Sequence, residues 1–313
     1  MNERQWLIVD TTGGEYARFS KIAPSERPIP GAVHKVALAG KPTFTDVLQA
    51  YARETGENLG ELAPLFCIAG AASGETISFA RANWTVTRAG LSTLFGTRVR
   101  VINDVVAMAW GAQSDRARIA ALRGARAQPD FKRPGRMIML FVGDGVGAAI
   151  VDIDRDGRRR VMETEAGHLE FAAHNERELR IAEKRRGDQS QTSWEQMLTL
   201  GKDDALWDGF TELRALDRER MLGEWFGRYV VGLVHAYGAW DGAILAGPRV
   251  ASLTGAGSKT SFDGAFVKRR TFQRLVMQAP VWTVSQDDPI LTGGAALMAI
   301  RAAEGRGSEA SPI

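Results

Sequence analysis

VDTTGGEYARF, residues 9–19, is the stretch from which the interpretation of the whole chain starts. The hydrophobic run WLIVD (6–10) precedes a glycine pair, and ARFSKI (17–22) follows it with the alternation typical of a second strand. A glycine turn between two strands can wrap backbone amides around a phosphate group, or it can be a simple hairpin. Glu15, directly after the glycines, places a negative charge where a phosphate would be repelled. The stretch therefore predicts paired strands and leaves phosphate binding open.

The bulk composition is that of an ordinary globular protein. The chain has 313 residues, of which 44% are hydrophobic and 25% charged, so we expect one large or two medium domains. The net charge is only +3, although arginines gather in segments 117–136, 154–160, 183–186 and 267–270. Because no zinc-finger, RNP or basic heptad pattern accompanies them, we interpret these segments as solvated surface and expect no nucleic-acid partner.

The single cysteine, Cys67, lies within the apolar run LFCIAG. One cysteine excludes a disulfide framework and a cysteine-based zinc site, and the apolar surroundings predict a small buried side chain. The first residues, MNERQWLIVD, lack the long apolar core of a signal peptide, and no apolar run approaches membrane-spanning length. We therefore expect a cytoplasmic protein that does not use a membrane as a partner.

Strands and helices alternate in the first third of the chain. Apolar residues at helical spacing with a glycine stop predict helices, and short apolar runs predict strands. The helices are expected at residues 43–55 and 87–96, and the further strands at 65–69, 76–80 and 99–103. The last of these strands ends in Asn103 and Asp104, where the next helix begins. A polar pair at such a point is where open α/β sheets place their ligands.

The rest of the chain repeats this design on a larger scale. Residues 114–136 are basic and show little periodicity, so we interpret them as a long surface connection. Two strands around a glycine-rich turn are expected at 136–154, a long helix at 217–240, a buried strand at 242–247, and a final helix at 292–300 followed by a frayed polar tail. The pattern predicts an α/β protein with two lobes around a shared cleft: a small lobe of residues 1–113, completed by 286–313, and a large lobe of residues 114–285.

Asp104 is the first residue with two possible roles. A single aspartate at a helix start is commonly the N-cap. The same carboxylate could instead act as a general base that accepts a proton from a substrate hydroxyl.

Three further acidic side chains and a histidine lie near glycines or helix starts. Glu165 and His168 in TEAGHLEF (164–171) could bind a metal or hydrogen-bond the adjacent hydroxyls of a polyol, and the absence of an HExxH pattern argues against the metal. We expect Glu170 to face solvent or a backbone partner. Ser193 and Gln196 resemble a capping box, and Glu195 between them could be a first-turn carboxylate favoured by the helix dipole.

Three glycine-rich turns complete the set of candidates. They are TTGGE (11–15), VGDGVG (142–147) and LAGPRV (245–250). Taken singly, each is a weak signal, because glycine pairs mark many hairpins that bind nothing.

The order and spacing of these motifs resemble those of the bacterial glucokinases, which belong to the hexokinase/actin-like ATPase superfamily. The resemblance covers nearly the whole chain. The family opens with an Asp-x-Gly-Gly-Thr-x-x-Arg loop, and VDTTGGEYAR (9–18) occupies that place. A segment with a tryptophan then leads to Ile-Asn-Asp in the family, as RANWTVT (81–87) leads to VINDV (101–105) here.

The later motifs follow in the family's order. The Gly-Thr-Gly-x-Gly hairpin corresponds to GDGVG (143–147), Glu-Gly-Gly-His to EAGH (165–168), and Ser-x-Glu to SWE (193–195). The long helix and Ala-Gly-Gly strand end correspond to residues 227–247. FVKRRTF (266–272) and PVWTVSQDDPILTGGAALM (280–298) are also similar to the family.

The resemblance implies a two-lobed actin-like (ribonuclease H-like) fold with glucose bound in a central cleft. It implies phosphoryl transfer from ATP with Mg²⁺, Asp104 as the base, and a homodimer. The matched sugar-binding positions are Asn103, Asp104, Glu165, His168 and Glu195. The matched nucleotide-binding positions are Asp10, Gly13, Gly14, Gly143, Asp144, Gly145 and Gly247, with Asp10 also matched to the metal position.

The departures from the family lie in the phosphate loops. Glu15 and Asp144 stand where the family has threonine, and Pro248 replaces a glycine. One extra residue separates Asp10 from Gly13, so either Asp10 or Thr11 takes the position of the family's metal-associated aspartate. An ionised carboxylate cannot donate a hydrogen bond to phosphate and repels it. Phosphate binding could be restored in three ways. A carboxylate could recruit Mg²⁺, Arg18 could neutralise Glu15, or the loops could use backbone amides alone.

Two functions therefore stay open. One is a glucokinase-like enzyme, and the other is a sugar-binding sensor or regulator that has lost catalysis. A third, a kinase or repressor of the repressor/open-reading-frame/kinase (ROK) group, lacks support because the chain has neither that group's cysteine-rich zinc motif nor an N-terminal helix-turn-helix. The phosphate donor and the identity of the hexose stay open as well.

Overall fold

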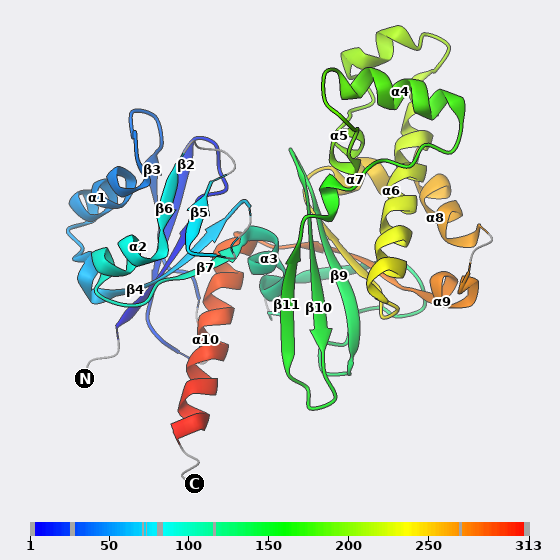
Figure 1. Cartoon of the computed structure of the whole chain (residues 1–313). Coiled ribbons are helices and arrows are strands. Elements are labelled where there is room, and N and C mark those ends of the chain that lie inside the picture. Colours follow the sequence, from blue (N-terminus) through cyan, green and yellow to red (C-terminus); the bar gives the residue numbers. More distant parts are fainter. Residues whose placement is uncertain are drawn as a thin grey trace. The chain divides into compact units, whose positions relative to one another are not determined.

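A computed structural model describes residues 4–25, 29–70, 72, 74–79, 84–114, 117–268 and 271–309. The chain divides into two compact units, Met1–Ala117 with Gln286–Ile313, and Arg118–Ser285. The sequence-based lobes have their boundaries at 113/114 and 285/286, and the compact units at 117/118 and 285/286. Each unit is an α/β structure with its own sheet and its own hydrophobic core (Figure 1).

The first unit is built on a five-stranded sheet with the strand order β3-β2-β1-β4-β7. Its strands are β1 (Gln5–Asp10), β2 (Tyr16–Ile22), β3 (Val33–Ala37), β4 (Leu62–Ile68) and β7 (Arg100–Asn103). β1, β4 and β7 run parallel, whereas β1–β2 and β2–β3 are antiparallel. A small separate hairpin is formed by β5 (Thr76–Ser78) and β6 (Thr85–Thr87). The hairpin expected around the first glycine pair is therefore confirmed.

Helices of the first unit contact both faces of this sheet. They are α1 (Phe44–Thr55), α2 (Arg88–Phe95), α3 (Asp104–Ala112) and α10 (Pro289–Glu309), with a short 3₁₀ turn, η1 (Leu59–Glu61). α1 begins in a capping box at Thr43, and it ends at Gly56 in the left-handed conformation, the glycine stop that the sequence predicted. α10 runs beside α3 (Figure 1), and Gly293 makes this possible, because a Cβ there would lie 1.7 Å from the Ala107 carbonyl oxygen.

The second unit is built on a six-stranded sheet with the order β11-β10-β9-β12-β13-β8. Its strands are β8 (Arg118–Arg123), β9 (Gly135–Val142), β10 (Val146–Ile153), β11 (Arg159–Thr164), β12 (Ala243–Ala246) and β13 (Val281–Ser285). β9, β10 and β11 form an antiparallel meander, and β9, β12 and β13 run parallel.

The helices of the second unit surround the long helix α6. They are α4 (Glu176–Arg186), α5 (Trp194–Leu198), α6 (Ala215–Tyr237), α7 (Val250–Thr254), α8 (Lys259–Val267) and α9 (Gln273–Gln278), with the 3₁₀ turns η2 (Ala166–His168) and η3 (Ala205–Gly209). The apolar stripe of α6 is buried, as its periodicity predicted, and includes Trp225, Phe226 and Val230 at 0% exposure.

Two sequence expectations about the fold are wrong. Residues 114–136 are not an unstructured connection throughout, because β8 forms within them and pairs antiparallel with β13 at the edge of the sheet. The polar tail after residue 300 does not fray at once, because α10 continues to Glu309. Over the described part of the chain, no helix is both long enough and apolar enough to cross a membrane.

Candidate functional site

The carboxyl ends of the parallel strands in the first unit bring Asp10 and Asn103 to one edge of the sheet. Asp10 is the last residue of β1 and pairs in register with Cys67 of β4, and Ile68 of β4 pairs with Asn103, the last residue of β7. Since neighbouring strands lie about 4.8 Å apart, Asp10 and Asn103 are on the order of 10 Å from each other across β4. This is the edge at which α/β sheets bind ligands.

Cys67 lies buried between these two strand ends, as expected for a small apolar side chain. Burial raises the pKa of its thiol, and the charges of Asp10 and Asp104 raise it further. The thiol is therefore a packing group beneath the strand ends and not a nucleophile.

Asn103, and not Asp104, caps helix α3. The Asn103 Oδ1 accepts hydrogen bonds from the backbone N–H groups of Val105 and Val106, and its Nδ2 donates to the Gly70 carbonyl at 3.1 Å. The interpretation of Asp104 as the N-cap is thus wrong, because the neighbouring amide already occupies that role. Asp104 is the first residue of the helix, where the helix dipole favours negative charge.

The carboxylate of Asp10 shapes the first glycine turn. It is 1% exposed, and its Oδ1 accepts from both the N–H and the hydroxyl of Thr12, at 2.9 and 2.7 Å. Its Oδ2 accepts from Arg18, which lies directly across the hairpin in the β1–β2 register. Arg18 also pairs with Asp288. Of the three open ways to restore phosphate binding, neutralisation of Glu15 by Arg18 is not favoured by the structure: the cross-strand partner of Arg18 is Asp10, and Glu15 is exposed.

The pKa of Arg18 reflects these partners. Burial alone lowers it, but the charges and hydrogen bonds of Asp10 and Asp288 outweigh burial and raise it above the ordinary value. Arg18 is therefore a permanent cation between two carboxylates.

Asp288 is a residue of this network that the sequence interpretation did not select. It directly precedes Pro289, the first residue of α10, and has a φ of 47°, a left-handed conformation that is uncommon for a non-glycine residue. The Asp-Pro step at a helix start was the available signal. Its partner could not be inferred, since Arg18 lies 270 residues earlier in the chain.

The Asp10 site does not fit direct coordination of a metal ion. A carboxylate has about four acceptor positions, and here Thr12 and Arg18 use all of them. Within the described residues, no group of three or more histidine, cysteine, aspartate or glutamate side chains is arranged to hold a metal. We therefore assign Asp10 the task of holding the turn and derive no step through a resident ion.

In the second unit, Glu165, His168 and Glu195 come together in what we call the carboxylate–imidazole cluster. His168 Nε2 lies 3.7 Å from Glu165 Oε2, and His168 Nδ1 lies 3.9 Å from Glu195 Oε1. The side chains of Glu165 and His168 are more than half exposed, and that of Glu195 is 30% exposed. The distances are longer than hydrogen bonds, so the polar atoms remain available to a ligand.

Close backbone packing holds this cluster to the second glycine turn. A Cβ on Gly167 would lie 2.2 Å from the Val146 carbonyl oxygen, so only glycine allows the approach. The Val146 N–H donates to Glu195 Oε2 at 2.8 Å, and a Cβ on Gly145 would lie 2.9 Å from the same oxygen. Glu195 is thereby fixed at one oxygen, while Oε1 remains beside His168.

The start of α5 is fixed in the same way. Ser193 and Gln196 form the capping box that the sequence predicted. Ser193 also pairs with Glu170 in an isolated β-bridge, and Glu170 is exposed, as expected. Glu195 thus sits in the first turn of a capped helix whose position is set by the segment that carries His168.

A buried ion pair supports the segment between His168 and α5. Arg228 Nη1 donates to both carboxylate oxygens of Glu178 at 2.9 and 2.8 Å, with the two side chains 4% and 7% exposed. The Arg228 guanidinium also donates to the Ala172 carbonyl and lies over the rings of Phe171 and Trp194, at 5.5 and 5.8 Å. The pair therefore anchors both chain segments that lead into the cluster.

The second and third glycine turns pack against each other. The Gly143 N–H donates to the Gly145 carbonyl at 2.9 Å, and the Arg249 N–H donates to the Val142 carbonyl at 3.1 Å. Gly247, with a φ of 107°, lies so close to Val142 that a Cβ would meet its backbone at 2.3 Å. The Asp144 side chain is exposed at the tip of the second turn.

A cavity of about 590 Å³ adjoins the third turn on the side of Arg249. Its polar lining includes Lys202, Asp203, Asp204 and Glu219. The carboxylates of this lining are acceptors of the kind that bind hydroxyl groups, such as those of a ribose.

The family follows from the match of the chain to a family model. The model described as glucokinase matches residues 7–201, more than half of the 313 residues. This chain belongs to the glucokinase family. It is similar to a glucokinase of Xylella fastidiosa (strain 9a5c), at 25% identity over 321 residues that cover 93% of this chain and 94% of the relative.

Solved structures show the fold of this family member. A glucokinase from Balamuthia mandrillaris, solved in complex with glucose, has a TM-score of 0.72 at 18% identity and covers 95% of this chain and 94% of its own. A ROK family transcriptional regulator has a TM-score of 0.60 at 15% identity, covering 96% of this chain and 79% of its own. The predicted α/β, two-lobed actin-like fold class is thus confirmed.

Parts of two motifs that resemble the family lie outside the described residues. These are residues 81–83 of RANWTVT and residues 269–270 of FVKRRTF. Trp84 of the first motif is described, and it is buried against Phe44 and Phe79.

Proposed function

We propose that this family member transfers the γ-phosphoryl group of ATP to the 6-hydroxyl of glucose, with Asp104 as the general base. The observation that carries the proposal is the carboxylate–imidazole cluster. Two carboxylates and an imidazole, spaced too widely to satisfy one another, offer acceptors and a donor to a ring of adjacent hydroxyls. Family membership makes a hexose the expected ligand.

Asn103 and Asp104 of the first unit are proposed as further sugar-binding residues. The Asn103 side chain already makes three hydrogen bonds, so at most one amide hydrogen is left for a sugar hydroxyl. Its main contribution is to fix the start of α3 and so the backbone of Asp104. Asp104 then accepts the proton of the attacking hydroxyl, which is the limited chemical help that phosphoryl transfer needs from a base.

The nucleotide is proposed to bind as MgATP, with the ion delivered as part of this substrate. Gly13 and Gly14 are exposed, and a Cβ on Gly14 would meet nothing within 4 Å, so the first turn is open to a phosphate. Gly143, Gly145 and Gly247 shape the two turns in the second unit. Exposed carboxylates at Glu15 and Asp144 are expected to weaken, but not to abolish, phosphate binding.

The second candidate is a sugar-binding sensor or regulator with a degenerate nucleotide site. It is favoured by the carboxylates of Glu15 and Asp144, because they would oppose phosphate binding without changing the carboxylate–imidazole cluster. A transcriptional regulator among the proteins of similar fold shows that this architecture also serves regulation.

One set of measurements separates the candidates. A coupled assay with glucose and MgATP should give turnover for the wild type and at least about a thousandfold less for Asp104→Asn. Asp156→Asn is the matched control, since Asp156 is exposed in the turn at the opposite end of β10 from Val146. Calorimetry should show glucose and MgATP binding separately. Glucose binding without MgATP binding would favour the sensor, and unchanged turnover in Asp104→Asn would refute the assigned base.

A further inference from the structure

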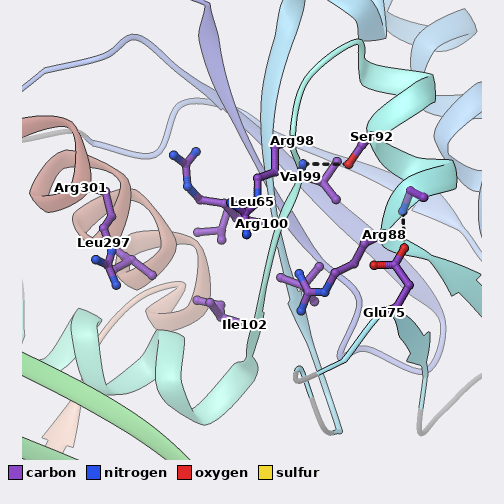
Figure 2. Close-up of a pocket in the computed structure, with 12 residues that line it drawn as sticks. Leu65, Glu75, Arg88, Ser92, Arg98, Val99, Arg100, Ile102, Leu297 and Arg301 are labelled. Carbon is purple, nitrogen blue, oxygen red and sulfur yellow. Dashed lines mark hydrogen bonds between the residues drawn. The ribbon is translucent and has the colours of Figure 1, made fainter. Parts of the chain in front are cut away.

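The first unit contains a cavity of about 730 Å³ that none of the proposed sugar or nucleotide residues lines. It lies between α2, β7 and α10 (Figure 2). The strand register explains its position: Arg98, Arg100 and Ile102 alternate with buried residues along the chain, and Arg100 pairs with Leu65 of β4. A Cβ on Gly294 of α10 would lie 3.3 Å from Leu65, so these side chains belong to the face of the sheet that α10 covers.

The lining of the cavity is strongly basic. Four arginines contribute to it from three elements and the loop before β7, namely Arg88, Arg98, Arg100 and Arg301, whereas Glu75 is the one acidic side chain. Figure 2 shows Arg301 on the α10 side and Arg88 on the opposite side, with Arg98 and Arg100 between them. The Glu75 carboxylate accepts a hydrogen bond from the Ala89 N–H at 2.7 Å, so one of its oxygens binds the start of α2 and not an arginine.

Three of the four arginines lack an acidic partner: within the described residues, Arg88, Arg98 and Arg100 form no ion pair with a carboxylate, whereas Arg301 pairs with the exposed Glu304 of its own helix at 3.1 Å. The recorded contact of the Arg100 guanidinium is with the Met298 sulfur at 3.9 Å. Arg88 donates to the carbonyls of Gly74 and Ala72 and so keeps its full charge. Like charges held together without counterions repel one another, and an anion bound among them would relieve this cost.

The remaining lining limits the kind of anion. Leu65, Ile102 and Leu297 supply apolar surface next to the guanidinium groups. The volume falls within the range of small-molecule sites. A concave site with a cationic rim and an apolar wall suits a small molecule that carries a phosphate group on a carbon skeleton, because guanidinium binds phosphate through paired hydrogen bonds.

We propose that this cavity is a binding site for a small phosphorylated metabolite. It is separate from the proposed catalytic base, because Arg100 begins β7 and Asp104 follows its last residue, about 13 Å further along the strand. The arginines bind the phosphate oxygens, and the apolar wall contacts the carbon skeleton. The site does not depend on the proposed reaction, since each of its groups lies in the first unit and none is a matched sugar or nucleotide residue.

The test is binding and not turnover. Calorimetry and thermal unfolding would be measured with inorganic pyrophosphate, a hexose 6-phosphate and a nucleoside monophosphate, with neutral hexose at equal ionic strength as the reference. The expected result is millimolar or tighter binding of at least one phosphorylated probe to the wild type. Arg98→Gln combined with Arg100→Gln should weaken that binding by at least about tenfold, because charge-assisted hydrogen bonds are lost.

Matched variants make the result specific. Arg53→Gln removes an exposed arginine of α1 away from the cavity and should leave the affinity unchanged. Arg100→Lys keeps the charge but loses the paired donors, so it should fall between the wild type and the glutamine variant. Tighter binding of the hexose 6-phosphate than of pyrophosphate would show that the apolar wall contributes, and equal binding would show recognition of phosphate alone.

Two results would overturn the proposal. One is that no phosphorylated probe binds the wild type, and the other is that Arg98→Gln with Arg100→Gln binds as tightly as the wild type. The second result would place the ligand at another site, including the proposed substrate site. Arg98 and Arg100 are exposed and lie among like charges, so their loss should not lower the unfolding temperature without ligand and should leave glucose binding intact.

Discussion

Replacing the acidic residues of the first and second glycine turns by threonine, Glu15→Thr with Asp144→Thr, should tighten the binding of MgATP. Both side chains are exposed, and both stand where the family has a hydroxyl. A carboxylate repels a phosphate and cannot donate to it, whereas threonine removes the repulsion and adds a donor. The change therefore acts on the nucleotide and leaves the carboxylate–imidazole cluster unaltered.

The exposure of the two side chains sets the size of the effect. Two unit charges 4 Å apart repel by about 1 kcal/mol in water and by about 4 kcal/mol at an effective dielectric of 20. Exposed carboxylates lie near the lower limit, so about 2 kcal/mol is expected for the pair, which is roughly a 30-fold lower Kd. The gain should shrink as salt is raised, because exposed charges are screened.

The assay is titration calorimetry of MgATP with the wild type and the double variant at two salt concentrations. The matched control is Asp188→Thr with Glu212→Thr, which removes the same charge from exposed positions of the second unit and should leave the affinity unchanged. Glucose affinity should be equal in all three proteins. Unchanged or weaker MgATP binding in the double variant would refute the inference that these carboxylates oppose the phosphates.

Three further changes test the geometry of the two units. Gly167→Ala places a methyl group 2.2 Å from a backbone carbonyl oxygen, so it should displace His168 and weaken glucose binding at least tenfold by calorimetry; unchanged affinity would contradict the packing described. Arg18→Met leaves the buried Asp10 carboxylate without its cation and should lower the free energy of unfolding by about 3 kcal/mol in urea titrations, and an unaltered midpoint would argue against the pair. Glu178 should give a pH-dependent contribution: burial raises its pKa, but Arg228 outweighs burial and the folded pKa is lowered. Its stabilisation is therefore complete above the unfolded pKa of about 4.3 and is lost as the pH falls through the folded pKa, so Glu178→Gln should be clearly less stable than the wild type at pH 7, by a margin that shrinks progressively as the pH falls below about 4.

The local structure of this chain could be predicted where short-range chemistry decides it. The β1–β2 hairpin, the glycine stop at Gly56 and the capping box at Ser193 depend on neighbours within a few residues. The residues of the carboxylate–imidazole cluster were singled out by residue type and position, and the resemblance to a family then matched them to sugar-binding positions. Their approach to one another depends on the packing of Gly167 on Val146, which no local pattern reveals.

The errors have physical reasons as well. β8 (RIAALR) contains a single β-branched residue, Ile119, which is a weak strand signal, and it is stabilised by pairing with β13 at the sheet edge. In the polar tail, α10 continues through Gly305 and Gly307, although glycine disfavours a helix. The alternative in which Arg18 neutralises Glu15 rested on their closeness in the sequence, whereas the strand register places Asp10 opposite Arg18.

Direct identification of the product tests the central claim most simply. Glucose and MgATP would be incubated with the wild type and with Asp104→Asn, and the products would be identified by mass spectrometry and phosphorus NMR. The account predicts glucose 6-phosphate in equimolar amount with ADP for the wild type and almost none for the variant. Stable glucose binding without any sugar phosphate, or sugar phosphate formed equally by both proteins, would contradict it.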